Sequence, residues 1–205
     1  MIDVVEDAIE DTIDDTRLEE LYRIGVDEVS YRKGHRYLTV VADHDRDGAV
    51  VWVAEGKDHS VLEAFYDELG EERTQKLETV TLDMGGANEK ATNAKAPHVI
   101  QCMDPFHYRL KHKSDAAYHL DWWLAWACRS PIPAFVTLSK TVRANRERIL
   151  PAVDLGLSNS RLEGLNSKIR LIDHCGYGHH TAASLIAMIY LCCGGITIEL
   201  PKAKI

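Results

Sequence analysis

Hydrophobic residues recur first at helical spacing and then at strand spacing along the first half of the chain. Val5, Ile9 and Ile13 lie four residues apart, which predicts an acidic amphipathic helix within residues 1–22. From residue 23, the stretches RIGVDEVSY, YLTVVADH and AVVWVAE alternate or are rich in β-branched residues, so we expect three strands. The turn sequence DRDG should join the second strand to the third as a hairpin.

The next fifty residues predict alternating helices and strands. HSVLEAFYDELG repeats its hydrophobic residues on one helical face and ends at Gly70, and ANEKATNA predicts a second helix. TVTLDM and HVIQCM are short and apolar, as buried strands are. Three antiparallel strands followed by alternating helices and strands is the order of a ribonuclease H-like fold. The expected fold class is therefore α/β, with a mixed five-stranded sheet flanked by helices.

The second half of the chain has mainly helical periodicity. Leu120 with Leu124 and Trp122 with Trp126 repeat four residues apart, and both pairs are expected in the core. PAFVTLSKTVRANRERIL predicts one basic amphipathic helix, and LSNSRLEGLNSKIRLI predicts another. The apolar stretch TAASLIAMIYLCCGGI is short for a membrane span and ends in two glycines. We therefore expect a buried helix there and no membrane association.

These patterns divide the chain into four expected segments. Residues 1–22 form the acidic N-terminal helix, and residues 23–113 form the first part of the ribonuclease H-like core. Residues 114–156 form a helical insertion, and residues 157–205 form the C-terminal helices of the core.

The charge of the chain is unevenly distributed. The net charge is −8, which by itself argues against a nucleic-acid partner. Residues 1–28, however, hold eleven Asp or Glu against two Arg, whereas residues 109–170 hold eleven Lys or Arg against five Asp or Glu. A basic region beside an acidic centre is compatible with a polyanionic substrate. On charge alone, a solvated helix face is the simpler explanation.

The cysteines favour free thiols. Five cysteines without a CxxC pair indicate a reducing cytoplasm, and the acidic N-terminal residues do not resemble a signal peptide. In DHCGYGHH a zinc site is conceivable, although the spacing fits no standard zinc pattern and the two glycines indicate a loop. The residues concerned are His174, Cys175, His179 and His180.

Two acidic patterns differ in their meaning. Asp43, Asp45 and Asp47 match the start of a calcium loop, but the twelfth position is Ala54 and the flanks predict strands, so a hairpin turn is expected. Asp27, in contrast, lies within an apolar strand, where a charge is costly unless it is paired or binds a metal. Asp83 ends another strand, immediately before two glycines.

Strand order predicts that Asp27 and Asp83 meet. If their strands are adjacent and parallel, both carboxylates lie where open sheets hold ligands, and Glu163 on a late helix could supply a third. Three carboxylates suit a pair of Mg²⁺ or Mn²⁺ ions. The alternative is an unrelated strand charge, a strand-end aspartate and a helix cap. Ser160 and Glu163 indeed have the spacing of a capping box.

These residues resemble motifs of the DDE transposases of prokaryotic insertion sequences, in the ISL3 group. IGVDEVSYRKGHRYLTVVADHD is similar to the first catalytic motif of that family, LDMGGA to the second, and SNSRLEGLNSKIRLI to the third. MDPFHYRLK resembles the D-x-F-H segment after the fifth strand. The resemblance implies a ribonuclease H-like fold and Mg²⁺-dependent DNA cleavage and strand transfer.

By position, the resemblance makes Asp27, Asp83 and Glu163 the catalytic, metal-binding acids. It gives supporting roles to Asp104, His107, Asn159 and Asn166. It implies DNA, both transposon ends and target, as the partner, and a homodimer is an expectation. Phosphate contacts are expected from Lys33, His35, Arg36, Lys168 and Arg170. Ordinary surface charge explains those basic residues equally well.

The chain also departs from the family pattern. Family members are longer, begin with a zinc-binding segment and a helix-turn-helix, and carry a longer helical insertion, so residues 114–156 are expected to be a shortened one. Gly85 and Asn88 stand where the family has Ser and Tyr. Two alternatives therefore accompany the transposase prediction: an inactive remnant that binds DNA or partner subunits, and a small non-specific metal-dependent nuclease.

Overall fold

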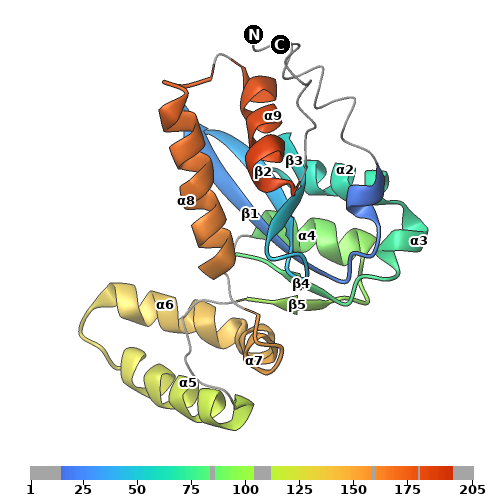
Figure 1. The fold of residues 1–205 in the computed structure, drawn as a ribbon. Coiled ribbons are helices and arrows are strands. Elements are labelled where there is room, and N and C mark those ends of the chain that lie inside the picture. Colours follow the sequence, from blue (N-terminus) through green and yellow to red (C-terminus); the bar gives the residue numbers. More distant parts are fainter. Residues whose placement is uncertain (1–14, 84–85, 104–111, 158–159, 180, 196–205) are drawn as a thin grey trace, which may run out of the picture.

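The expected mixed sheet is present in the computed structural model, which describes residues 15–83, 86–103, 112–157, 160–179 and 181–195. Five strands lie in the order β3-β2-β1-β4-β5 (Figure 1). Antiparallel pairing joins β1 (Arg23–Arg32), β2 (Arg36–Asp43) and β3 (Ala49–Glu55), whereas β4 (Thr79–Thr81) and β5 (Ile100–Cys102) run parallel to β1. This is a ribonuclease H-like α/β fold, as the sequence predicted.

The register between β1 and β4 positions the two aspartates. Gly25 pairs with Thr81 at the end of β4, and β1 then continues to Arg32. Asp27 and Asp83 each lie two residues beyond this last pair. Because side chains alternate along extended backbone, both aspartates should share the sheet face of Gly25 and Thr81.

The two faces of the sheet are covered by different helices. On one face, Ile24 and Val26 of β1 join a core with α2 (His59–Leu69) and α4 (Gly86–Lys95). On the other, Val29 and Tyr31 of β1 join a core with two helices late in the chain. These are α8 (Ser160–Cys175) and α9 (Ala182–Cys193), as Figure 1 shows. Two short helices, η1 (Asp15–Leu18) and α3 (Glu71–Thr74), complete the sheet region in the described residues.

Three helices form a separate group beside the sheet: α5 (Lys113–Ala127), α6 (Pro133–Ala144) and α7 (Arg146–Asp154) (Figure 1). They share a core to which Leu120, Leu124 and Met103 contribute. The prediction of one basic helix over residues 133–150 was wrong. The chain divides at Asn145, whose φ of −101° and ψ of 10° are not helical, so α6 ends and α7 begins there.

The core prediction for the tryptophans was also wrong. Leu120 and Leu124 are buried, but Trp122 and Trp126 are 63% and 50% exposed. The four-residue spacing of each pair is correct for a helix, yet the two pairs lie on opposite faces of α5. Among the described residues, the core of the three helices buries the leucine face, whereas on the tryptophan face Phe135 contacts Trp126 and leaves it half exposed.

The remaining sequence predictions have mixed outcomes. The expected hairpin turn is present: Asp43 ends β2, and Asp45 and Asp47 lie in the turn before β3. The apolar stretch forms α9 with a buried face. All five cysteines, each in the described part, are free thiols. Among the described residues, no helix is long and apolar enough to cross a membrane. The predicted N-terminal helix lies mostly outside the described residues. The side chain of Ser160 is also outside them, so the predicted capping box between Ser160 and Glu163 is not tested.

Gly25 allows α8 to lie close to the sheet. A Cβ atom added at Gly25 would be 2.7 Å from Leu162 Cδ1, 2.9 Å from His44 Nε2 and 3.0 Å from Thr81 Oγ1. Any side chain there would push α8 away from β1. Gly164, on the outer side of the same helix, has no such neighbour within 4 Å.

We expect Gly25→Ala to lower the free energy of unfolding by about 1–3 kcal/mol, because an overpacked core must shift. Gly164→Ala is the matched control and should raise it by roughly 0.5–1 kcal/mol, since alanine favours a helix interior. Urea unfolding of both variants measures the difference. A Gly25→Ala protein as stable as wild type would show that the approach of α8 does not depend on this glycine.

Candidate active site

Asp27 is a half-buried carboxylate held between the sheet and α8. Its Oδ1 accepts a hydrogen bond from the backbone N–H of Glu28 at 2.8 Å, and its Oδ2 accepts one from Asn166 Nδ2 at 2.7 Å. Asn166 is 8% exposed, and in the described part of the chain its Oδ1 has no hydrogen-bond partner. The polar residue predicted at this helix position therefore contacts the predicted catalytic acid directly.

The electrostatic surroundings of Asp27 place Asp83 nearby. Burial raises the pKa of Asp27, the hydrogen bonds from Glu28 and Asn166 oppose that shift, and the negative charge of Asp83 raises the pKa further. The positive charge of Arg170 lowers it. A second negative charge beside this half-buried carboxylate makes a site where a bound cation would be stabilised.

Glu28 is a third carboxylate beside Asp27 and Asp83, and sequence reasoning missed it. It points to the opposite sheet face, where Asn88 Nδ2 of α4 donates to its Oε1. Burial raises the pKa of Glu28, and the charges of Asp27 and Asp83 add to that effect. The signal in the sequence was the Asp-Glu doublet, because consecutive acids in a buried strand must face both layers.

Glu163 lies on the flank of α8 that faces β4. Leu162 and Asn166 face the sheet, and Arg161 NH1 donates to the carbonyl of His44, which follows β2, at 3.0 Å. Each helical residue turns by about 100°, so Glu163 is on the side opposite Arg161. Since β2 and β4 flank β1 on its two sides, that is the side of β4. Arg170, two turns after Glu163, shares this flank and acts on Asp27.

The three predicted acids thus lie on the same side of the site, but their carboxylates are not grouped into one set of metal ligands. Among the described residues, no three His, Cys, Asp or Glu side chains are grouped so that they could hold a metal ion. Asp83 and Glu163 are exposed, whereas Asp27 is half-buried. The donors nevertheless fit a hard divalent cation, because carboxylates and the unpartnered Oδ1 of Asn166 are all oxygen ligands.

The predicted phosphate contacts are scattered. Lys33 and His35 lie in the turn between β1 and β2, and Arg36 pairs with Glu55 at 3.6 Å. Lys168 is on the far flank of α8, where its Nζ donates to the carbonyl of Cys192 at 2.5 Å. Arg170 is the member of this set whose charge acts on Asp27. Asp104, His107 and Asn159 lie outside the described residues.

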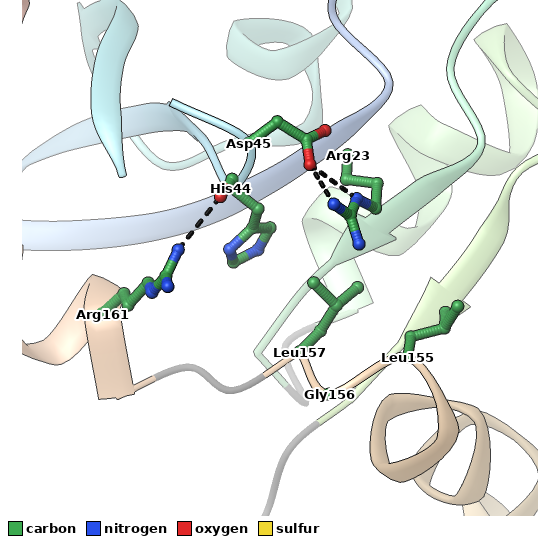
Figure 2. Close-up of a pocket in the computed structure, with 7 residues that line it drawn as sticks. All are labelled: Arg23, His44, Asp45, Leu155, Gly156, Leu157 and Arg161. Atoms are coloured by element: carbon green, nitrogen blue, oxygen red, sulfur yellow. Dashed lines mark hydrogen bonds and ion pairs between the residues drawn. The ribbon is translucent and has the colours of Figure 1, made fainter. Parts of the chain in front are cut away.

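A pocket of about 480 Å³ lies at the beginning of α8, near the start of β1 (Figure 2). Figure 2 shows His44 between Arg161 and Arg23, with Leu157 below it. His44 Nε2 is 2.8 Å from Thr81 Oγ1, and burial, followed by the charge of Arg161, lowers the pKa of His44. Arg23 pairs with Asp45. The guanidinium groups therefore serve mainly to join α8 and β1 to the β2–β3 turn.

The histidines and cysteine at the end of α8 and in the segment after it form no metal site in the described part of the chain. His174 and Cys175 are exposed, and His179 Nδ1 is 3.3 Å from Ser184 Oγ. His180 lies outside the described residues. Whether these residues bind zinc with His180 stays an open prediction.

Comparison with known proteins identifies the family. A transposase family model, that of the ISL3-group DDE transposases, matches residues 24–109 and 108–189. The chain belongs to this family. It is 28% identical over 280 residues to the transposase for insertion sequence element IS1557 of Mycobacterium tuberculosis, covering 90% of this chain and 63% of that protein.

A second relative is the transposase for insertion sequence element IS1001 of Bordetella parapertussis. It is 33% identical over 89 residues, which is 43% of this chain and 22% of that protein. The chain thus spans less than two thirds of the length of these relatives.

The raised pKa of Asp27 predicts a stability effect. A carboxyl whose pKa is raised on folding binds its proton more tightly in the folded state, so its charged form costs stability above that pKa. Without divalent ions, Asp27→Asn should therefore have a higher Tm than wild type at neutral pH. The difference should shrink as the pH falls through the folded pKa toward the unfolded one.

Melting curves from neutral to acidic pH measure this difference. The amide of Asn166 can rotate so that its Oδ1 accepts from the amide introduced by Asp27→Asn. Asp58→Asn, at an exposed carboxylate that makes no cap hydrogen bond, is the control and should not raise the Tm. A lower Tm for Asp27→Asn at neutral pH would show that the charged carboxylate is well compensated in the fold.

Proposed function

We propose that this chain is the catalytic domain of a DNA transposase that cleaves phosphodiester bonds at insertion-sequence ends and joins the freed strands to target DNA. The observation that carries the proposal is the position of Asp27 and Asp83 beyond the last residue pair of two parallel strands, close enough for the charge of Asp83 to raise the pKa of Asp27. Family membership supports the same reaction class.

Asp27, Asp83 and Glu163 are the residues we propose as ligands for two Mg²⁺ or Mn²⁺ ions. When bound, such a pair of ions activates the attacking oxygen and stabilises the leaving oxygen of a phosphodiester. The exposed carboxylates would have to approach Asp27 for this purpose. Both belong to positions that can move: Asp83 follows the end of a strand, and Glu163 has a long side chain on an exposed helix flank.

The chain's own residues would orient these acids. Asn166 fixes one oxygen of Asp27, and the Glu28 backbone N–H fixes the other, which leaves the remaining lone pairs directed outward. Glu28, held by Asn88 on the opposite face, adds negative charge behind the site. Catalysis would depend on positioning and charge stabilisation, without a covalent enzyme intermediate.

Arg170 is the basic residue best placed to contact the scissile region of DNA, because its charge already acts on Asp27. Lys33, His35 and Arg36 lie at the hairpin turn that ends β1, and would contact more distant phosphates. At about 3.3 Å per residue, this end of β1 is roughly 17 Å from Asp27. Lys168 would have to release the carbonyl of Cys192 to bind a phosphate. The free cysteine thiols are compatible with action in a reducing cytoplasm.

The aligned positions of the IS1557 transposase that have no counterpart in this chain favour a second candidate, a remnant that binds DNA or transposase subunits without cleaving. A small nuclease without sequence preference is the third. All three predict different outcomes for the same plasmid assay.

The purified chain should nick supercoiled plasmid when Mg²⁺ or Mn²⁺ is titrated in, and EDTA should abolish the nicking. Asp27→Asn and Glu163→Gln should each reduce the rate about 100-fold or more, as loss of a group that stabilises transition-state charge does. Glu71→Gln, at an exposed glutamate at the start of α3, is the matched control and should keep wild-type activity.

The outcomes separate the candidates. No nicking by the wild-type chain at any metal concentration favours the inert remnant. Nicking without preference for a duplex carrying the insertion-sequence ends, and without joined products, favours the nuclease. Wild-type nicking by Glu163→Gln would remove this glutamate from the set of acids.

A further inference from the structure

One face of α5 carries an exposed row of large aromatic side chains. Tyr118, Trp122 and Trp126 are 71%, 63% and 50% exposed and follow one another at four-residue spacing. The opposite face of the helix packs into the core through Ala116, Leu120, Leu124 and Ala127. We call the three residues Tyr118, Trp122 and Trp126 the aromatic row.

The aromatic row is a large exposed surface, although Phe135 of α6 packs against Trp126 at one end of it, with ring centroids 5.3 Å apart. An aromatic side chain buries 150–250 Å² when enclosed, so the exposed fractions correspond to roughly 400 Å² of mostly apolar surface. A contiguous exposed patch of that size usually marks an interaction site. In Figure 1, α5 is the helix farthest from the sheet.

The comparison with relatives gives a reason for the exposure. The alignment with the IS1557 transposase is 280 positions long, but it includes only 90% of the 205 residues of this chain, which is about 185 residues. About 95 aligned positions of the relative therefore have no counterpart in this chain. The family match divides at residues 108–109, shortly before α5. The divided match indicates that part of the additional chain of the longer relative falls here, next to the helix that carries the aromatic row.

The pattern of residues on this face is self-complementary. If two α5 helices cross antiparallel with Trp122 against the partner's Trp122, then Tyr118 lies against the partner's Trp126. In the same arrangement, Asp115 lies against the partner's Arg129, so each end of the pair brings opposite charges together. Asp115 and Arg129 are both exposed. Helical periodicity places Asp115 on the side of the aromatic row, and Arg129 follows Cys128, the helical C-cap residue of α5, at the end of the same row.

We propose that the aromatic row binds a second copy of this chain, in a two-fold symmetric α5–α5 contact centred on Trp122. Such an isologous contact uses each residue twice, and aromatic residues at its centre are the usual source of binding energy. Roughly 400 Å² per protomer is about half of a standard interface. The dimer is therefore expected to be weak, with a Kd in the micromolar range.

Single-stranded DNA is the alternative occupant, because exposed tryptophans can stack on bases. The surroundings of the aromatic row do not favour it. Asp115 and Asp121 lie on or beside this face, with Arg129 next to it and Arg146 paired with Asp121 at 3.0 Å. Among the described residues the two charge signs therefore balance here, without the positive excess of a nucleic-acid groove.

Sedimentation velocity over a wide range of protein concentrations tests the proposal. Metal and DNA are absent, so the result does not depend on the proposed function. The weight-average mass of the wild-type chain should rise with concentration toward that of a dimer. Trp122→Ser should stay monomeric, and Leu171→Ser, which removes an exposed hydrophobic residue from α8, should associate like wild type. Circular dichroism checks that each variant is folded.

Exchanging the charges of Asp115 and Arg129 distinguishes the proposed antiparallel geometry from non-specific hydrophobic association. Asp115→Arg places two arginines against each other, and Arg129→Asp places two aspartates together, so each single variant should associate about tenfold more weakly, roughly 1.4 kcal/mol. The double variant Asp115→Arg/Arg129→Asp restores opposite charges and should recover wild-type association.

Two results would overturn the proposal. A wild-type chain that is monomeric at every concentration has no such interface, and a double variant as weak as the single ones excludes the antiparallel pairing. Quenching of tryptophan fluorescence by single-stranded DNA, in a chain that does not self-associate, would assign the aromatic row to base stacking instead.

Discussion

The parallel pairing of β1 with β4 is the contact on which the candidate site depends. It aligns Gly25 with Thr81, and so brings Asp27 and Asp83, 56 residues apart in the chain, to the same level of the sheet. The absence of a side chain at Gly25 then lets Leu162 approach the sheet, which places Asn166 against Asp27. Two backbone features, a register and a glycine, thus position groups from three distant segments.

The site has a cost that the rest of the fold must offset. A carboxylate within an apolar strand loses solvation, and a second carboxylate beside it adds repulsion. Asn166 and the Glu28 backbone N–H reduce this cost, and Asn88 does the same for Glu28 on the opposite face. The extensive cores on both faces of the sheet supply the stability that a strained polar centre requires.

Strand order and the positions of the acids could be predicted from the sequence because both depend on short-range patterns. Alternation identified β1, the turn residues identified the hairpin, and strand-end position identified Asp83. The pairing of Glu28 with Asn88 could not be predicted, since it depends on which helix covers which face. The exposure of Trp122 and Trp126 depends on how many neighbours surround α5, which periodicity does not encode. The flank of α8 that carries Glu163 became clear only from the contact of Arg161 with the β2–β3 turn.

Direct observation of bound Mn²⁺ tests whether the three acids form one metal centre. A crystal grown with Mn²⁺ and measured at the manganese absorption edge locates each ion by its anomalous signal. The account predicts Mn²⁺ at about 2 Å from oxygens of both Asp27 and Asp83, with Glu163 turned toward the same ions. Mn²⁺ bound elsewhere, or a site at Asp27 from which Asp83 and Glu163 are both absent, would contradict it.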